Sequence, residues 1–113
     1  MKIRFKKTMK IASELLSYCH SIGGREYNLN ISEEEELLTF VITSSPAEVG
    51  EREMERLRTS LNAPRQREIE QDYWELIGES ASHSELTLLG MLCDDAIVDY
   101  RNKVLTITLK RHD

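Results

Sequence analysis

AIVDYRNKVLTITLK, residues 96–110, contains the pattern that decides the fold. Two runs, Ile97 to Tyr100 and Val104 to Leu109, flank the polar residues 101–103. In the second run the apolar residues alternate with polar ones, Leu105, Ile107 and Leu109 with Thr106, Thr108 and Lys110. A period of two is typical of a strand with one buried face. The end of the chain is therefore predicted to be an antiparallel hairpin.

Two more alternating runs lie upstream. Tyr27, Leu29 and Ile31 alternate with asparagines, and Leu38, Phe40 and Ile42 alternate with Thr39, Val41 and Thr43. These runs predict a second hairpin, with Ser32 and the glutamates 33–36 in its loop. Residues 2–6 alternate Lys, Ile, Arg, Phe, Lys, and predict a short strand at the start of the chain.

Four segments have helical spacing. The first begins at Thr8 and stops at Gly23-Gly24, with apolar residues every three or four positions: Met9, Ala12, Leu15, Leu16, Cys19 and Ile22. Ser45-Pro46-Ala47-Glu48 is a helix-start motif, and Met54, Leu57 and Leu61 fit the inner face of the helix after it. The spacing predicts two further helices, one over 69–77 and one over 86–96 that follows the capping box at 82–85.

The predicted order is β-α-β-β-α-α-α-β-β. This order favours an α+β fold, a two-layer sandwich in which a mixed, mostly antiparallel sheet carries helices on one face. With 113 residues, of which 40% are hydrophobic, the chain 1–113 is expected to be a single domain. No apolar run approaches the roughly 20 residues that span a bilayer, and no apolar signal core follows the first charges. We expect a cytoplasmic protein of bacterial or archaeal type.

Composition excludes several function classes. The formal net charge is -5, and the basic residues near both ends alternate with apolar ones without an aromatic stacking platform, which argues against nucleic-acid binding. Cys19 and Cys93 fall on apolar helix faces and are expected to be buried, reduced thiols, with no metal-ligand spacing around them. The signatures of serine hydrolases, zinc proteases, Walker-loop ATPases and dithiol redox proteins are all missing from the sequence.

Residues 85–111 resemble the end of a known family. The stretch ELTLLGMLCDDAIVDY at 85–100, followed by Asn102 and VLTITLKR at 104–111, is similar to the last helix and last two strands of the small anti-sigma-factor serine kinases. These belong to the ATP-binding fold shared by histidine kinases, gyrase, Hsp90 and MutL. The helix with ELLSYC at 14–19 lies where that family has its asparagine-bearing helix, and residues 38–45 lie where a strand runs into its D-x-G-x-G loop. The resemblance implies a minimal histidine-kinase-like ATPase fold.

The chain departs from the family at the residues that hold nucleotide. The magnesium asparagine falls four residues after Glu14, at Tyr18, and a phenol is a poor substitute as a magnesium ligand. The adenine-reading aspartate falls near Ser44 and Ser45. The glycine-rich phosphate loop falls at 79–88, which contains no glycine; its polar residues include Ser80, Ser82 and Ser84. Tyr18, these five serines and their loops are the candidate degenerate ligand pocket.

Three functions remain open at this point. The first is a regulatory or protein-interaction module that has lost its nucleotide motifs, needs no cofactor, and binds a regulator, a sigma-like factor or a second copy of itself. The second is an active small serine/threonine protein kinase, in which ATP with Mg is bound and Glu14 is the catalytic base that the resemblance implies. The third is an unrelated α+β domain that serves as an acidic partner, as an antitoxin does.

Overall fold

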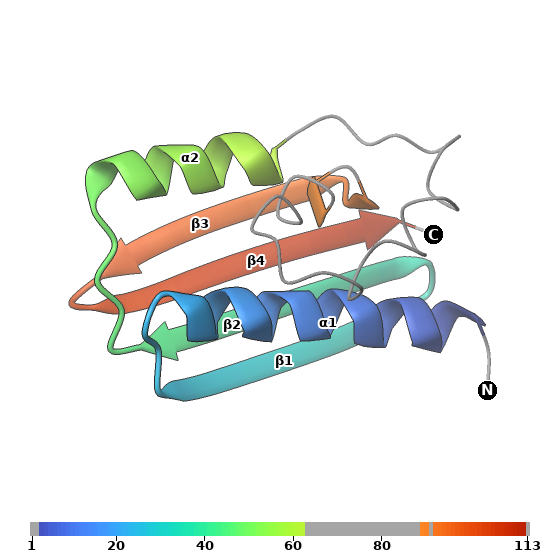
Figure 1. Ribbon diagram of the computed structural model, residues 1–113. Helices are drawn as coiled ribbons and strands as arrows, with labels where there is room; N and C mark the ends of the chain where they lie inside the picture. Colours follow the sequence, from blue (N-terminus) through green and yellow to red (C-terminus); the bar gives the residue numbers. More distant parts are fainter. Residues whose placement is uncertain (1–2, 63–88, 91, 113) are drawn as a thin grey trace.

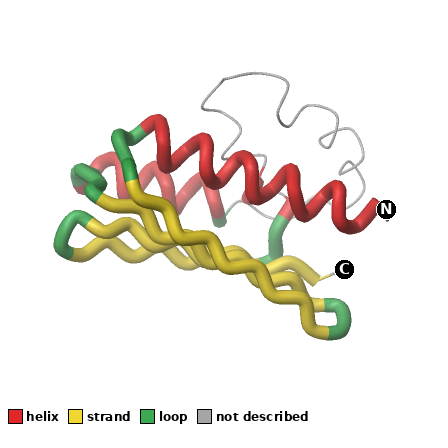
Figure 2. The backbone as a smooth tube through the Cα atoms, turned by 90° about the horizontal axis from the view of Figure 1, so that it is seen from below, coloured by secondary structure: helices red, strands yellow, loops and turns green. Residues whose placement is uncertain are grey.

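The computed structural model describes residues 3–62, 89, 90 and 92–112. Their elements follow in the order α1 (Ile3–Ser21), β1 (Glu26–Glu34), β2 (Leu37–Ser45), α2 (Glu51–Leu61), β3 (Asp95–Arg101) and β4 (Val104–His112). The strands form one sheet in the order β1-β2-β4-β3, and each neighbouring pair is antiparallel. Both helices lie on the same face of the sheet (Figures 1 and 2). Within the described residues, the α+β class with helices on one face is confirmed.

The two predicted hairpins form as β1–β2 and β3–β4. Leu29 lies opposite Ile42 in the first, and Val98 lies opposite Ile107 in the second. The first hairpin is longer than predicted: β1 continues through Glu34, and only Glu35 and Glu36 form the turn. A short strand-to-strand turn suffices because Glu35 adopts positive φ.

The core lies between the sheet and the helices, and the alternation in the sequence determines which side chains enter it. Phe40, Ile42, Leu105 and Ile107 are fully buried on the helix side of the sheet. The helices cover them with apolar side chains: Ile11, Leu15 and Cys19 from α1, and Met54, Leu57 and Leu61 from α2. The predicted inward-facing residues of β4 and of α2 are therefore confirmed.

The strand predicted at residues 2–6 is wrong from Ile3 onward, because α1 begins there. Alternation over five residues fits the flank of a helix as well as a strand, and no glycine or proline separates Lys6 from Thr8. Lysine and arginine are also good helix formers. The helical period that begins at Thr8 therefore extends back to Ile3.

The helix start predicted at Ser45-Pro46 is also wrong. Ser45 is the last residue of β2, where it pairs with Glu26, and α2 begins at Glu51 after Gly50 as N-cap. The intervening segment is held against the second hairpin: the Ala47 amide donates to the Lys103 carbonyl at 2.7 Å. Tyr100 Oη donates to the Ala47 carbonyl at 2.6 Å. These contacts outweigh the local capping motif.

The remaining helix predictions are only partly testable. The helix over 69–77, and the capping box at 82–85 that precedes the helix over 86–96, lie outside the described residues. Leu89 and Leu92 have helical backbone and are buried, as expected for the helix over 86–96. Its predicted end is wrong, because Ala96 is in β3. The ladder that pairs Ala96 with Leu109 ends the helical segment before Asp95.

Candidate functional site

Glu14 and Tyr18 lie on the side of α1 that faces α2, and Ser44 lies beneath the C-terminal end of α1. Glu14 and Tyr18 are one turn apart on α1, and both are buried. Ser44 is buried near the end of β2, and Ser45 next to it is partly buried. Ser80, Ser82 and Ser84 lie outside the described residues.

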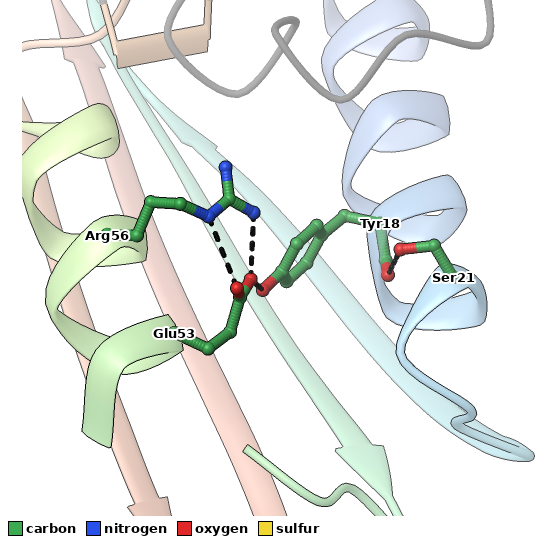
Figure 3. Close-up of polar contacts among 4 residues, drawn as sticks. All are labelled: Tyr18, Ser21, Glu53 and Arg56. Atoms are coloured by element: carbon green, nitrogen blue, oxygen red, sulfur yellow. Dashed lines mark hydrogen bonds and ion pairs between the residues drawn. The ribbon is translucent and has the colours of Figure 1, made fainter. Parts of the chain in front are cut away.

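Tyr18 connects the two helices. Its ring points from α1 toward α2, and its hydroxyl donates a 2.6 Å hydrogen bond to Glu53 Oε2 (Figure 3). Arg56 holds the same carboxylate from one turn along α2, with Nε 3.2 Å from Oε1 and Nη2 2.9 Å from Oε2. The Tyr18 carbonyl also accepts from Ser21 Oγ at 2.6 Å. Tyr18, Glu53 and Arg56 are called the interhelical triad below.

The triad fixes the protonation state of the phenol. Burial is the larger cause that raises the pKa of Tyr18 well above its ordinary value, and the hydrogen bond to Glu53 raises it further. The hydrogen bonds that Arg56 donates to Glu53 raise the pKa of Arg56. Tyr18 is therefore a neutral donor whose only proton is used by a carboxylate of the same chain. A neutral phenol has little of the oxygen charge that magnesium requires.

Glu14 lies on the same flank of α1 as Tyr18, but it is enclosed rather than open to solvent. Its side chain is 9% exposed and makes an interaction within the protein. A base that activates a nucleophile needs access to a reacting group. The structure leaves the catalytic role of Glu14 as a hypothesis.

Ser44 lies in a different environment from Tyr18. Its Oγ is buried without a well-formed hydrogen bond among the described residues, although it approaches the Cys19 thiol closely enough to lower that thiol's pKa slightly. Burial dominates and raises the pKa of Cys19 from 9.0 to about 11. Gly24 closes the other side, since a Cβ there would overlap Ser44 Oγ and lie 2.9 Å from the Cys19 carbonyl oxygen. The prediction that Cys19 and Cys93 are free, buried thiols is confirmed.

The structure therefore does not join the described candidates into one pocket. Tyr18 is hydrogen-bonded toward α2, whereas Ser44 lies between Cys19 and Gly24 under the end of α1. The sequence reasoning also missed Glu53 and Arg56. Their spacing of three residues on a predicted helix indicates an ion pair, but nothing in the sequence indicates that Tyr18, 35 residues away, reaches it.

A second feature is a strip of exposed apolar side chains beside β1. Phe5, Met9 and Leu16 on α1 and Tyr27 and Ile31 on β1 are between 36% and 51% exposed. Leu29, between the last two, is partly buried. These six residues are called the edge surface below. Isolated exposed apolar residues are ordinary, but a contiguous group is typical of a binding surface.

The edge surface is continuous because one flank of α1 faces β1. A helix turns by about 100° per residue, so Phe5, Met9 and Leu16 lie within about 40° of one another, and His20 lies about 20° further round. His20 Nδ1 is 3.2 Å from Tyr27 Oη, which places this flank over β1. Tyr18, which contacts α2, lies on the opposite flank.

In comparisons with known proteins, no family model matches the chain and no curated protein is similar enough to count as a relative. None of the helices in the described part of the chain is long and apolar enough to cross a membrane.

Proposed function

We propose that this chain is a regulatory module that works by binding protein, on a histidine-kinase-like ATPase fold that no longer binds nucleotide. The observation that carries the proposal is the edge surface: exposed apolar side chains lie next to a strand, β1, whose second edge pairs with no other strand among the described residues. Apolar area gives affinity and an open strand edge gives backbone hydrogen bonds, which are the two requirements of β-strand recognition between proteins.

The interhelical triad supports the loss of nucleotide binding. Under the resemblance, Tyr18 takes the position of the magnesium asparagine, and its hydroxyl is engaged by Glu53. Turning Tyr18 toward a ligand would break that hydrogen bond to Glu53. At the adenine-reading position, Ser44 is buried and lacks a carboxylate.

A calorimetric titration with ATP and ADP, with and without magnesium, tests this proposal. We expect no saturable heat at millimolar nucleotide. Saturable binding at micromolar nucleotide would overturn the proposal and favour the kinase alternative. In that case Glu14→Gln should abolish phosphotransfer, and unchanged phosphotransfer would remove Glu14 as the base.

A further inference from the structure

The backbone groups at the free edge of β1 belong to alternate residues. The turn at Glu35 and Glu36 makes Glu34 and Leu37 a hydrogen-bonded pair, so the even-numbered residues of β1 bond to β2. The odd-numbered residues then direct their amides and carbonyls outward. The register has no bulge between Glu26 and Glu34, so this alternation holds along the whole strand.

The same odd-numbered residues have side chains on the helix side of the sheet. Leu29 and Ile31 lie opposite Ile42 and Phe40, which are buried beneath the helices. An antiparallel strand added at this edge must place its own outward-bonding residues opposite them. If that strand is β1 of a second copy, odd residues face odd residues. Both helix layers then lie on the same side of one continuous sheet.

One register gives complementary contacts over the full strand. With Leu29 opposite Leu29 of the second copy, Tyr27 faces Ile31, an aromatic residue opposite a β-branched one. Arg25, the residue before β1, then comes level with Glu33, so opposite charges lie near each other at both ends of the paired segment; the Arg25 amide itself donates to the Ser45 carbonyl at 3.1 Å and adds no hydrogen bond across the edge. Each of these contacts occurs twice because the two copies are related by a two-fold axis.

The neighbouring register lacks this complementarity. With Asn30 on the axis, Glu26 faces Glu34 of the second copy, and Tyr27 faces Glu33. Like charges directly opposite each other destabilise a strand pair. Charge therefore disfavours the register with Asn30 on the axis, and the register with Leu29 on the axis is the one that brings Arg25 level with Glu33.

The helix layer fits the same arrangement. α1 contacts both β1 and β2, and so it lies over the boundary between them (Figure 1). Across the axis, the two copies of α1 would be about two strand spacings apart, or about 10 Å. Packed helices lie about 8–10 Å apart. The flank that each helix turns to the axis is the apolar one, with Phe5, Met9 and Leu16.

The other edge of the sheet, at β3, also carries an exposed apolar residue, Ile97, but charged side chains surround it. β3 is covered by α2, whose exposed residues are mostly charged and include Glu51, Arg52, Glu55 and Arg58. β3 itself carries exposed Asp95 and Asp99. Charged residues at a strand edge are a common protection against pairing with another chain.

We propose that the edge surface binds a second copy of this chain, with β1 paired antiparallel to β1, Leu29 on the two-fold axis and Arg25 opposite Glu33. The proposal rests on the proposed function, since it names the protein that the edge surface binds. It joins two four-stranded sheets into one and covers the apolar flank of α1 in each copy.

Sedimentation equilibrium of charge-reversal variants tests the pairing. The parent chain should dimerise, and at low salt either Arg25→Glu or Glu33→Arg should raise the dissociation constant about tenfold, because attraction becomes repulsion at two symmetric positions. The double variant Arg25→Glu/Glu33→Arg should return it to within about twofold of the parent. Arg101→Glu, on exposed β3, is the matched control and should change nothing. A chain that stays monomeric up to about 1 mM would overturn the proposal. A dimer whose dissociation constant is unchanged in both single charge-reversal variants would overturn it as well.

Cysteine cross-linking tests the register independently of charge. Leu29→Cys places two thiols on the axis with a Cα separation of about 5.5 Å, which a disulfide spans. Asn30→Cys, one residue away, faces Asn28 of the second copy and should not cross-link; a cross-link there in place of one at 29 would overturn the register. The two native cysteines are buried and do not interfere. Neither readout involves nucleotide, so failure of the dimer is distinguished from failure of the proposed function, which the ATP titration measures.

Discussion

Replacing Tyr18 with phenylalanine should destabilise the protein by removing one hydrogen bond and little else. The ring stays in place between α1 and α2, so its buried apolar area is retained. The lost bond is 2.6 Å long and its acceptor is a carboxylate. Hydrogen bonds to charged groups contribute about 1.5–3 kcal/mol. Glu53 keeps Arg56 and is 31% exposed, so water compensates for part of the loss. We expect the free energy of unfolding to fall by about 1–2 kcal/mol.

Urea unfolding at pH 7 measures this change as a lower midpoint with an unchanged slope. Tyr100→Phe is the matched control, because its hydroxyl donates to the neutral Ala47 carbonyl and should cost only about 1 kcal/mol. In a Glu53→Gln background the cost of Tyr18→Phe should shrink toward that of Tyr100→Phe, since the acceptor is no longer charged. A loss below about 0.3 kcal/mol for Tyr18→Phe would refute the account of the triad.

Three further predictions concern stability. Burial raises the pKa of Cys19 from 9.0 to about 11, so the stability that the neutral thiol contributes is fully present below pH 9 and is lost as the pH rises toward 11. Cys19→Ala should therefore remove about 2 kcal/mol of the fall in unfolding free energy between pH 9 and pH 11. An equal fall in the parent and the variant would show that Cys19 is not the group responsible. Gly90→Ala should lower the free energy of unfolding by about 1–3 kcal/mol in urea, because a Cβ there would lie 2.9 Å from the Leu61 carbonyl oxygen. Gly50→Ala should be nearly neutral, because a Cβ at Gly50 would have no atom within 4 Å. Equal urea midpoints for the two variants would contradict this prediction. Lys103 has a φ of 62° in the β3–β4 turn, which glycine adopts without steric cost. Lys103→Gly should therefore stabilise the fold by about 1 kcal/mol and raise the thermal midpoint. A lower midpoint would show that the contacts of the Lys103 side chain outweigh the backbone strain.

The strands could be predicted because their alternation is long and each strand has one buried face. In β2 the apolar positions 38, 40 and 42 are all buried, and positions 37, 39, 41 and 43 are all partly exposed. In β4 the same holds for positions 105, 107 and 109. A period of two over nine residues leaves little room for another structure.

Short motifs failed where distant residues determine the backbone. The capping motif at Ser45 is locally sound, yet Ala47 is held by Lys103 and Tyr100 from the second hairpin. At Ile3 the reverse applies: a brief alternation is absorbed into a longer helix whose period continues to Ser21. In both cases a few residues contain less information than the element they join.

The sequence was enough to identify residues of the candidate site, but not the contacts that those residues make. Counting from Glu14 identifies Tyr18, and the structure places both on one flank of α1. Glu53 and Arg56 were missed because the bond that matters joins residues on two different helices. The edge surface was missed for a related reason: the apolar stripe of α1 is wider than the core requires, and only the position of β1 shows which part stays exposed.

Backbone amide spectra by two-dimensional NMR, recorded on dilution and again with magnesium and ATP, test the central claim most directly. If the chain binds protein through the edge surface, dilution should shift the amides of residues 25–33 and of the α1 flank around Met9, and millimolar MgATP should shift none of the amides around Tyr18 and Ser44. Shifts around Tyr18 and Ser44 on addition of MgATP, with residues 25–33 unchanged on dilution, would contradict it.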